Sequence, residues 1–253
     1  MSRLFDLTGN VAIVIGGSGG IGSILAAGLA DEGATVVVAS RSMEKLEPVA
    51  ARIRAQGKKA LAVSVDISQQ PSVTNLVEQV LKSFKRVDIL VNCAGLAIRN
   101  VPENMPVDDW QKVMDFNVRG VFLSCQTIGK AMIEQGGGKI INISSVRGRY
   151  GADGTIAYGT SKGAVDSMTR ILAFEWAKYK VLVNAIAPTV VATELTRPLL
   201  TKPEKAKSIL ERIPLGRLEQ PEDLIGPTVF LASKASDFIT GQIIYVDGGA
   251  TIG

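Results

Sequence analysis

The sequence predicts an α/β fold in which helices flank a doubly wound, parallel sheet of seven strands. Short apolar and β-branched runs alternate with longer segments of helical period along the whole chain. A helix that follows a strand returns the chain to the end of the sheet at which that strand began, so the next strand lies parallel to the first. No linker or low-complexity tract divides the 253 residues, and we therefore expect one domain over residues 1–253.

Each element is expected from its period and from its bounding residues. The apolar runs that predict strands are residues 11–15, 35–39, 60–65, 87–91, 139–143, 181–186 and 243–246. The segments that predict the main helices are residues 23–31, 43–56, 71–84, 107–135, 155–178 and 222–232. Residues 190–214 lack a regular period and follow a strand's carboxyl end, so they are a candidate substrate lid.

The composition excludes several kinds of active site. The chain has no histidine, which removes the Ser-His-Asp triad, the Cys-His dyad and histidine-ligated metals. Its two cysteines, Cys93 and Cys125, have no metal or redox spacing and suit a reducing cytoplasm. No apolar run reaches the roughly 18 residues of a membrane span, and the N-terminus lacks a signal peptide's apolar core. We expect a cytoplasmic protein without a bound metal or a membrane partner.

The charge distribution does not indicate nucleic-acid binding. The formal net charge is only +4, the basic residues are scattered, and aromatic residues make up 5% of the chain. A nucleic-acid site would favour a basic stripe with interleaved aromatic side chains. We therefore expect a small-molecule partner and no nucleic acid.

A glycine-rich turn after the first strand predicts a dinucleotide site. The glycines fit G-x-G-x-x-G through Gly17, Gly19 and Gly22, and G-x-x-x-G-x-G through Gly16, Gly20 and Gly22. Between a strand and a helix, the backbone N–H groups of such a turn and the helix dipole bind a pyrophosphate. A purely structural turn is the alternative.

The end of the second strand favours NADP(H) over NAD(H). NAD-binding units place a carboxylate at about this position to hold the ribose hydroxyls. Here Ser40 and Arg41 stand there, so no carboxylate repels a 2′-phosphate and a guanidinium can pair with it. Alternatively, Arg41 is only the solvated residue after a strand. Asp66 and Asn92 end the next two strands, within reach of an adenine or ribose.

Tyr158, Lys162 and Ser145 form a candidate catalytic group. Tyr158 and Lys162 are four residues apart, so on a helix they share one face. An ammonium beside a phenol stabilises the phenolate and lowers its pKa, which allows proton exchange with an alcohol or carbonyl oxygen near neutral pH. Ser145 follows a strand and can donate to the same oxygen. The alternative is an exposed tyrosine and lysine on an ordinary amphipathic helix.

Together the motifs resemble the short-chain dehydrogenase/reductase family over essentially the whole chain. The matching pieces, in the family's order, are the glycine turn, Asp66, Asn92-Cys93-Ala94-Gly95, Asn117, Ser145, Tyr158 with Lys162, and Pro188 to Thr193. The resemblance implies a Rossmann fold, with NADP(H) as cofactor and NAD(H) as the alternative. The cofactor residues that it implies, with those above, are Gly16, Ser18, Gly20, Ile21, Gly22, Ser40, Arg41, Asp66, Ile67, Asn92, Ala94, Gly95, Tyr158, Lys162, Pro188, Val191 and Thr193.

The resemblance also implies the catalytic roles. Tyr158 is expected to be the general acid–base, and Lys162 to lower its pKa and hold the nicotinamide ribose. Ser145 would polarise the substrate oxygen, and Asn117 would anchor a water that relays protons from Lys162. A mid-helix asparagine often bonds to the backbone, so the alternative for Asn117 is that it only makes a local bend.

Three residues depart from the family pattern. Ile15 stands where the family usually has threonine, Cys93 replaces the second asparagine of Asn-Asn-Ala-Gly, and Thr189 replaces the glycine after Pro188. These departures affect fine positioning around the cofactor and leave the catalytic residues unchanged.

The substrate is expected to be a ketone or secondary alcohol on a sugar acid or a similar polar compound. Arg99, Arg147 and Arg149 follow strand ends near the expected substrate mouth with Ser145 and Tyr158, and clustered guanidiniums pair with carboxylates. Each arginine can equally be a solubilising charge. The C-terminal tail resembles the gluconate 5-dehydrogenase and 2-deoxygluconate 3-dehydrogenase branch. The alternatives are a 3-oxoacyl-thioester (acyl carrier protein) reductase and a catalytically quiet NADP-binding sensor or scaffold.

The resemblance implies a homotetramer or homodimer. In this family the two long helices, here at residues 107–135 and 155–178, usually form the dimer interface. Both segments carry much apolar surface in this sequence.

Overall fold

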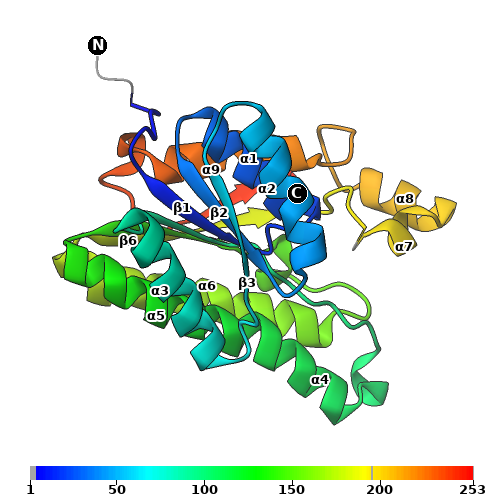
Figure 1. The fold of residues 1–253 in the computed structure, drawn as a ribbon. Helices are drawn as coiled ribbons and strands as arrows, with labels where there is room; N and C mark the ends of the chain where they lie inside the picture. Colours follow the sequence, from blue (N-terminus) through cyan, green and yellow to red (C-terminus); the bar gives the residue numbers. More distant parts are fainter. Residues whose placement is uncertain (1–3, 195, 253) are drawn as a thin grey trace.

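A parallel sheet of seven strands lies at the centre of the computed structural model, which describes residues 4–194 and 196–252 (Figure 1). The strands are β1 (Val11–Ile15), β2 (Thr35–Ser40), β3 (Ala60–Ser64), β4 (Ile89–Asn92), β5 (Gly138–Ile143), β6 (Val181–Pro188) and β7 (Ile243–Val246). Their order across the sheet is β3-β2-β1-β4-β5-β6-β7. The order reverses between β1 and β4, which confirms the predicted doubly wound Rossmann fold. Such a reversal opens a crevice at the carboxyl ends of the strands.

Helices cover both faces of the sheet (Figure 1). The long helices are α1 (Gly20–Asp31), α2 (Met43–Ala55), α3 (Gln70–Phe84), α5 (Gly120–Gln135) and α6 (Ile156–Trp176), and the shorter ones are α4 (Val107–Met114), α7 (Arg197–Leu200), α8 (Pro203–Leu210) and α9 (Ile225–Ala232). In the view of Figure 1, α1, α2 and α9 lie above the sheet, and α3, α5 and α6 lie below it. None of the helices among the described residues is both long and apolar enough to cross a bilayer.

The strands are continuous apolar runs because both of their faces are buried. In β1, Ile13 and Ile15 belong to the core under α3, α5 and α6, whereas Ala12 and Val14 belong to the core under α1, α2 and α9. All five residues of β1 are buried. The expected alternation of strand and helix is confirmed, with element ends that differ from the prediction by a few residues.

The long helical segment predicted over residues 107–135 is present, and it contains an irregular turn at its middle. A π-helical turn at Asp115–Arg119 separates α4 from α5. Asn117 lies in this turn, fully buried, and its side chain binds the backbone of Leu96 instead of facing solvent. The polar contact therefore replaces the regular helical geometry at this one position.

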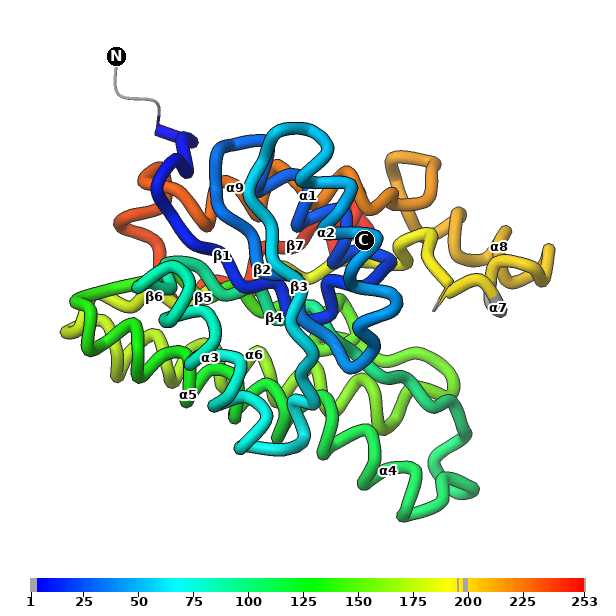
Figure 2. Tube along the Cα trace, in the orientation of Figure 1, coloured from blue at the N-terminus to red at the C-terminus, as the bar shows by residue number. Residues whose placement is uncertain are grey.

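Residues 190–214 contain the two short helices α7 and α8. Figure 2 shows this segment projecting beyond the sheet and its two helical layers. Leu195, inside the predicted lid, lies outside the described residues.

Candidate active site

A cleft of about 470 Å³ lies over the glycine turn, at the carboxyl ends of the strands. Every predicted cofactor residue except Asp66 and Asn92 lines it. Several other residues that the sequence analysis did not select line it as well, among them Phe116 and Thr196. The crevice that the sheet order creates is therefore the one that the glycine motif marks.

The glycine turn is packed so closely that side chains are excluded from it. Gly16 has φ +85°, and a Cβ on it would lie 2.7 Å from the backbone nitrogen of Ala94. A Cβ on Gly22 would lie 2.2 Å from the carbonyl oxygen of Gly16. Helix α1 begins at this turn without a side-chain cap, so its first N–H groups face the cleft. Such a terminus accommodates a pyrophosphate.

The end of β2 supplies groups suited to a 2′-phosphate. Ser40 lines the cleft, and its Oγ is buried without a hydrogen-bond partner in the described part of the chain. The Arg41 guanidinium lies 5.6 Å from the centroid of the Phe116 ring and also lines the cleft. An unpaired hydroxyl and an exposed guanidinium match the needs of a phosphate ester.

The side chains of Asp66 and Asn92 make hydrogen bonds to protein groups outside the cleft lining. Asp66 Oδ1 accepts hydrogen bonds from the N–H and the hydroxyl of Ser68, at 3.0 and 2.7 Å. Asn92 Nδ2 donates to Asn142 Oδ1 at 2.9 Å and to the Cys125 sulfur at 3.3 Å, inside the core. In this structure neither side chain lines the cleft.

Lys162 and Tyr158 both reach the cleft from α6. The Lys162 ammonium is buried, donates to the carbonyl oxygen of Ile143 at 2.7 Å, and lies 5.6 Å from the centroid of the Tyr158 ring. Ser145 Oγ accepts a hydrogen bond from the backbone N–H of Arg147 at 3.2 Å. Since that contact uses the oxygen as acceptor, the hydroxyl proton of Ser145 is left to donate elsewhere.

Asn117 connects the loop after β4 with α6. Its Oδ1 accepts from Leu96 N–H at 2.8 Å, and its Nδ2 donates to Leu96 oxygen at 2.8 Å and to Ser161 Oγ at 2.9 Å. Both amide N–H groups and one lone pair of Oδ1 are therefore used in holding these two segments together.

A second cavity of about 1460 Å³ adjoins the cleft. Among the described residues, four line both spaces, and they are Ser145, Tyr158, Thr189 and Thr196. A molecule in the large cavity would therefore meet a molecule in the cleft at the Ser145 and Tyr158 hydroxyls.

Two of the three predicted substrate arginines line the large cavity. Arg99 and Arg147 do so, but Arg149 does not, since its guanidinium lies over the Tyr245 ring at 5.4 Å from the centroid. Arg212, which the sequence analysis did not select, lines the cavity in its place. The signal for it was its position inside the predicted lid.

Comparison with known proteins agrees with this geometry. A short-chain dehydrogenase model described as "Enoyl-(Acyl carrier protein) reductase" matches residues 16–251. The chain belongs to the short-chain dehydrogenase/reductase family.

Three relatives within this family show the range of its chemistry. The chain is 42% identical over 246 residues to the 2-dehydro-3-deoxy-D-gluconate 5-dehydrogenase of Dickeya dadantii, covering 97% of this chain and 96% of the relative. It is 39% identical over 248 residues to the NAD-dependent glycerol dehydrogenase of Listeria innocua, covering 98% and 96%. It is 41% identical over 245 residues to the 3-oxoacyl-[acyl-carrier-protein] reductase of a Synechocystis strain, covering 96% and 97%.

A solved structure has nearly the same fold. It is a gluconate 5-dehydrogenase from Burkholderia cenocepacia in complex with NADP and tartrate, 37% identical, with a TM-score of 0.96. The match covers 99% of this chain and 98% of the other.

The departures from the family pattern are accommodated by backbone contacts. The carbonyl oxygen of Ile15 accepts a hydrogen bond from Cys93 N–H at 2.9 Å, so the strand still holds the segment after β4 without a threonine. Burial raises the pKa of the Cys93 thiol to about 12, which keeps it protonated. Thr189 N–H donates to Glu219 Oε2 at 2.8 Å. Thr189 is thus tied to a residue that the sequence analysis did not select.

Glu219 is a buried carboxyl beside this short-chain dehydrogenase/reductase cleft. It is 6% exposed, and its Oε1 has no hydrogen-bond partner among the described residues. Burial, reinforced by the negative charges of Asp223 and Asp247, raises its pKa to about 8. No local sequence pattern marked it, because its burial results from the packing of the loop after β6.

Proposed function

We propose that this protein is an oxidoreductase that interconverts a ketone and a secondary alcohol with a nicotinamide cofactor. The observation that supports this most is that the Ser145 and Tyr158 hydroxyls stand where the cofactor cleft meets the large cavity. When bound, NADPH supplies the hydride that reduces the carbonyl carbon.

Four residues would carry the proton chemistry. Tyr158 would protonate the substrate oxygen, and Ser145 would donate a hydrogen bond to the same oxygen. The buried Lys162 ammonium lies 5.6 Å from the tyrosine ring centroid, beside Tyr158 in the cleft, and would hold the nicotinamide ribose. Asn117, whose amide joins the loop after β4 to α6, would anchor a water that relays protons from Lys162.

NADP(H) is the proposed cofactor, with NAD(H) as the alternative. The unpaired Ser40 hydroxyl and the Arg41 guanidinium support a 2′-phosphate site at the end of β2. The NADP in the Burkholderia structure supports the same choice, whereas the NAD-dependent Listeria relative supports the alternative.

A keto group on a sugar acid or a similar polar compound is the proposed substrate. The cavity is lined by Arg99, Arg147 and Arg212, which favour an anion, and the gluconate-type relatives act on such acids. A 3-oxoacyl-thioester reductase is the second candidate, because the volume of about 1460 Å³ exceeds the ~300–1,000 Å³ of most small-molecule pockets. The Synechocystis relative has that activity.

Initial rates with a small substrate panel would test the proposal. We would measure NADPH and NADH consumption with 5-ketogluconate, an acetoacetyl thioester and a neutral aryl ketone. Tyr158→Phe is expected to abolish turnover and to leave NADPH binding within about twofold. Full activity in this variant would refute the assigned chemistry. NADPH binding without any Tyr158-dependent turnover would instead favour a sensor or scaffold.

We also propose a cytoplasmic homotetramer or homodimer. Both cysteines are free, which suits a reducing compartment. Ile171 and Phe174 on α6 and Phe122 on α5 are exposed large apolar side chains, a pattern that supports a subunit interface over these helices. Sedimentation of a monomer at micromolar concentration would overturn the oligomer.

A further inference from the structure

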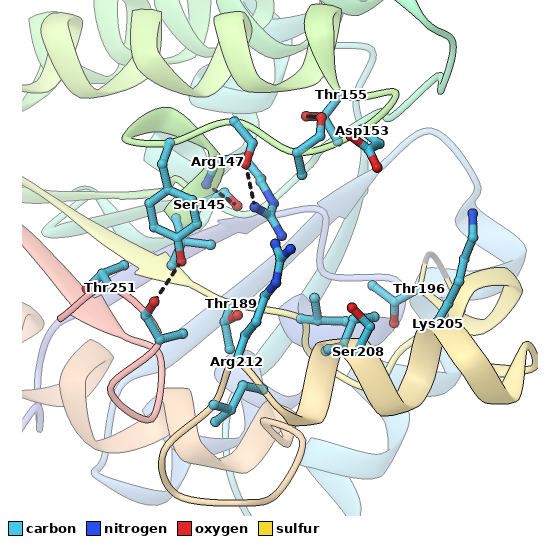
Figure 3. Close-up of a pocket in the computed structure, with 18 of the residues that line it drawn as sticks. Ser145, Arg147, Asp153, Thr155, Thr189, Thr196, Lys205, Ser208, Arg212 and Thr251 are labelled. Carbon is cyan, nitrogen blue, oxygen red and sulfur yellow. Dashed lines mark hydrogen bonds between the residues drawn. The ribbon is translucent and has the colours of Figure 1, made fainter. Parts of the chain in front are cut away.

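Two guanidiniums from distant parts of the chain point toward one another across the large cavity. Arg147 lies in the short turn at Val146–Gly148 that follows β5, and Arg212 lies just beyond the end of α8. Figure 3 shows the two side chains converging from opposite walls. Arg99 lines the same cavity.

These like charges are close enough to affect each other. Burial lowers the pKa of Arg147, and the positive charges of Arg212 and Arg99 lower it further. Within the described residues, none of the ion pairs includes Arg99, Arg147 or Arg212. Asp153, Glu204 and Glu211 line the cavity, and none of the three forms an ion pair with these arginines among the described residues. Positive charges that lie close together without a counter-ion repel one another, and an anion bound between them offsets this electrostatic repulsion.

Arg147 is held in a fixed orientation. Its Nη1 donates to the carbonyl oxygen of Gly151 at 3.1 Å, and its guanidinium lies 5.4 Å from the centroid of the Tyr150 ring. Tyr150 is itself tied to the C-terminal segment, because its hydroxyl donates to the carbonyl oxygen of Ala250 at 3.3 Å. One nitrogen is used in this way, and the other N–H groups of the planar fork remain open to a ligand.

The same short turn is joined to Ser145. Ser145 Oγ accepts from the backbone N–H of Arg147, so the hydroxyl that would polarise the carbonyl is tied to the backbone that carries the guanidinium. A keto acid whose carboxylate binds Arg147 would therefore place its carbonyl, several bonds from the carboxylate, beside Ser145 and Tyr158.

We propose that Arg147 and Arg212 together bind the carboxylate of the substrate, and that this bound carboxylate holds α8 against the body of the molecule. The proposal rests on the proposed function, because it assigns the acid end of a keto acid whose carbonyl meets Tyr158. Arg212 would be a specificity-determining residue supplied by the lid, and Arg147 its fixed partner.

The test compares acids with neutral substrates. Initial rates of wild type, Arg147→Gln and Arg212→Gln would be measured with NADPH on 5-ketogluconate and on the neutral aryl ketone. Loss of one charge-assisted hydrogen-bonding partner is expected to raise KM for the keto acid about 10- to 100-fold. KM for the neutral ketone and the Kd of NADPH are expected to change less than about twofold.

A charge-matched control lies on the same helix. Lys207 on α8 is exposed and is not part of the cavity lining, so Lys207→Gln removes one positive charge without touching the pair. Its KM for 5-ketogluconate is expected to stay within about twofold of wild type. An equal effect of Lys207→Gln and Arg212→Gln would show general electrostatic attraction and overturn the clamp.

A direct binding measurement separates the clamp from the reaction. Titration of NADP-saturated protein with D-gluconate and with tartrate is expected to show binding that Arg212→Gln weakens about tenfold or more, and limited trypsin cleavage within α8 is expected to slow when the acid binds. Equal affinities in wild type and variant, or no acid binding in wild type, would overturn the clamp. Tyr158-dependent turnover of the neutral ketone would still support the oxidoreductase in either case.

Discussion

Replacing Glu219 by glutamine is expected to make the stability of the protein less dependent on pH. Glu219 is buried, its Oε2 accepts from Thr189 N–H, and its backbone carbonyl accepts from Ala192 N–H at 3.0 Å. These contacts hold the loop after β6, next to the cofactor cleft. Glutamine has the same shape and still offers an oxygen to Thr189, but it carries no charge at any pH.

The sign of the effect follows from the raised pKa. Burial is the largest cause, and it moves the pKa of Glu219 from 4.5 to about 8. Between these two values the folded protein keeps a proton that the unfolded chain releases, so stability falls as the pH rises through this window and is level above about pH 8. At about 1.4 kcal/mol for each pKa unit, the full loss is on the order of 3–5 kcal/mol.

Urea unfolding at pH 5, 7 and 9 would measure this difference. Glu219→Gln and wild type are expected to have similar free energies of unfolding near pH 5. The variant is expected to be more stable at pH 9 by a few kcal/mol. Glu222→Gln, at an exposed carboxyl on the same segment, is the control and should change the free energy of unfolding only slightly.

The refuting result is equally specific. A Glu219→Gln variant that is no more stable than wild type at pH 9 would mean that the carboxylate is well solvated or paired when ionised. The inference that burial dominates its energetics would then be wrong.

Two further substitutions test the cofactor end of the site and the junction at the π-helical turn. Arg41→Ala is expected to raise the Kd of NADPH about 10- to 100-fold and that of NADH less than about threefold, because only NADPH carries the 2′-phosphate. Fluorescence titrations would measure both constants, and an equal loss of affinity for the two cofactors would contradict the role of Arg41. Asn117→Ala leaves the Leu96 N–H and carbonyl unpaired, at about 1–3 kcal/mol each, so thermal unfolding should shift down by several degrees; an unchanged Tm would show that water replaces the amide.

Local motifs predicted most of the cofactor cleft. The glycine turn, Ser40 with Arg41, and Tyr158 with Lys162 are short patterns whose spacing already determines which atoms can meet. Asp66 and Asn92 were predicted as cofactor residues from their place at strand ends, but their side chains bind Ser68 and the core instead. A strand's end can be read from the sequence, whereas the direction of its last polar side chain depends on the neighbouring strand.

The large cavity was much harder to predict. Arg99, Arg147 and Arg149 were all plausible from their positions after strands, yet Arg149 lies over Tyr245 and Arg212 lines the cavity. Loops carry no periodicity from which the direction of a side chain can be inferred.

The sequence by itself determined the fold class and the order of the elements, and it selected Asn117, Ser145, Tyr158 and Lys162 as the candidate catalytic group. A strand buried on both faces is a continuous apolar run, and a helix buried on one face has apolar residues at helical spacing. Both patterns can be recognised in the sequence alone. Only the tertiary structure decided that Arg147 faces Arg212 and that Glu219 is buried, with its Oε1 unpaired among the described residues. Those properties arise where segments far apart in the chain pack together, and no local pattern of residues encodes such an encounter.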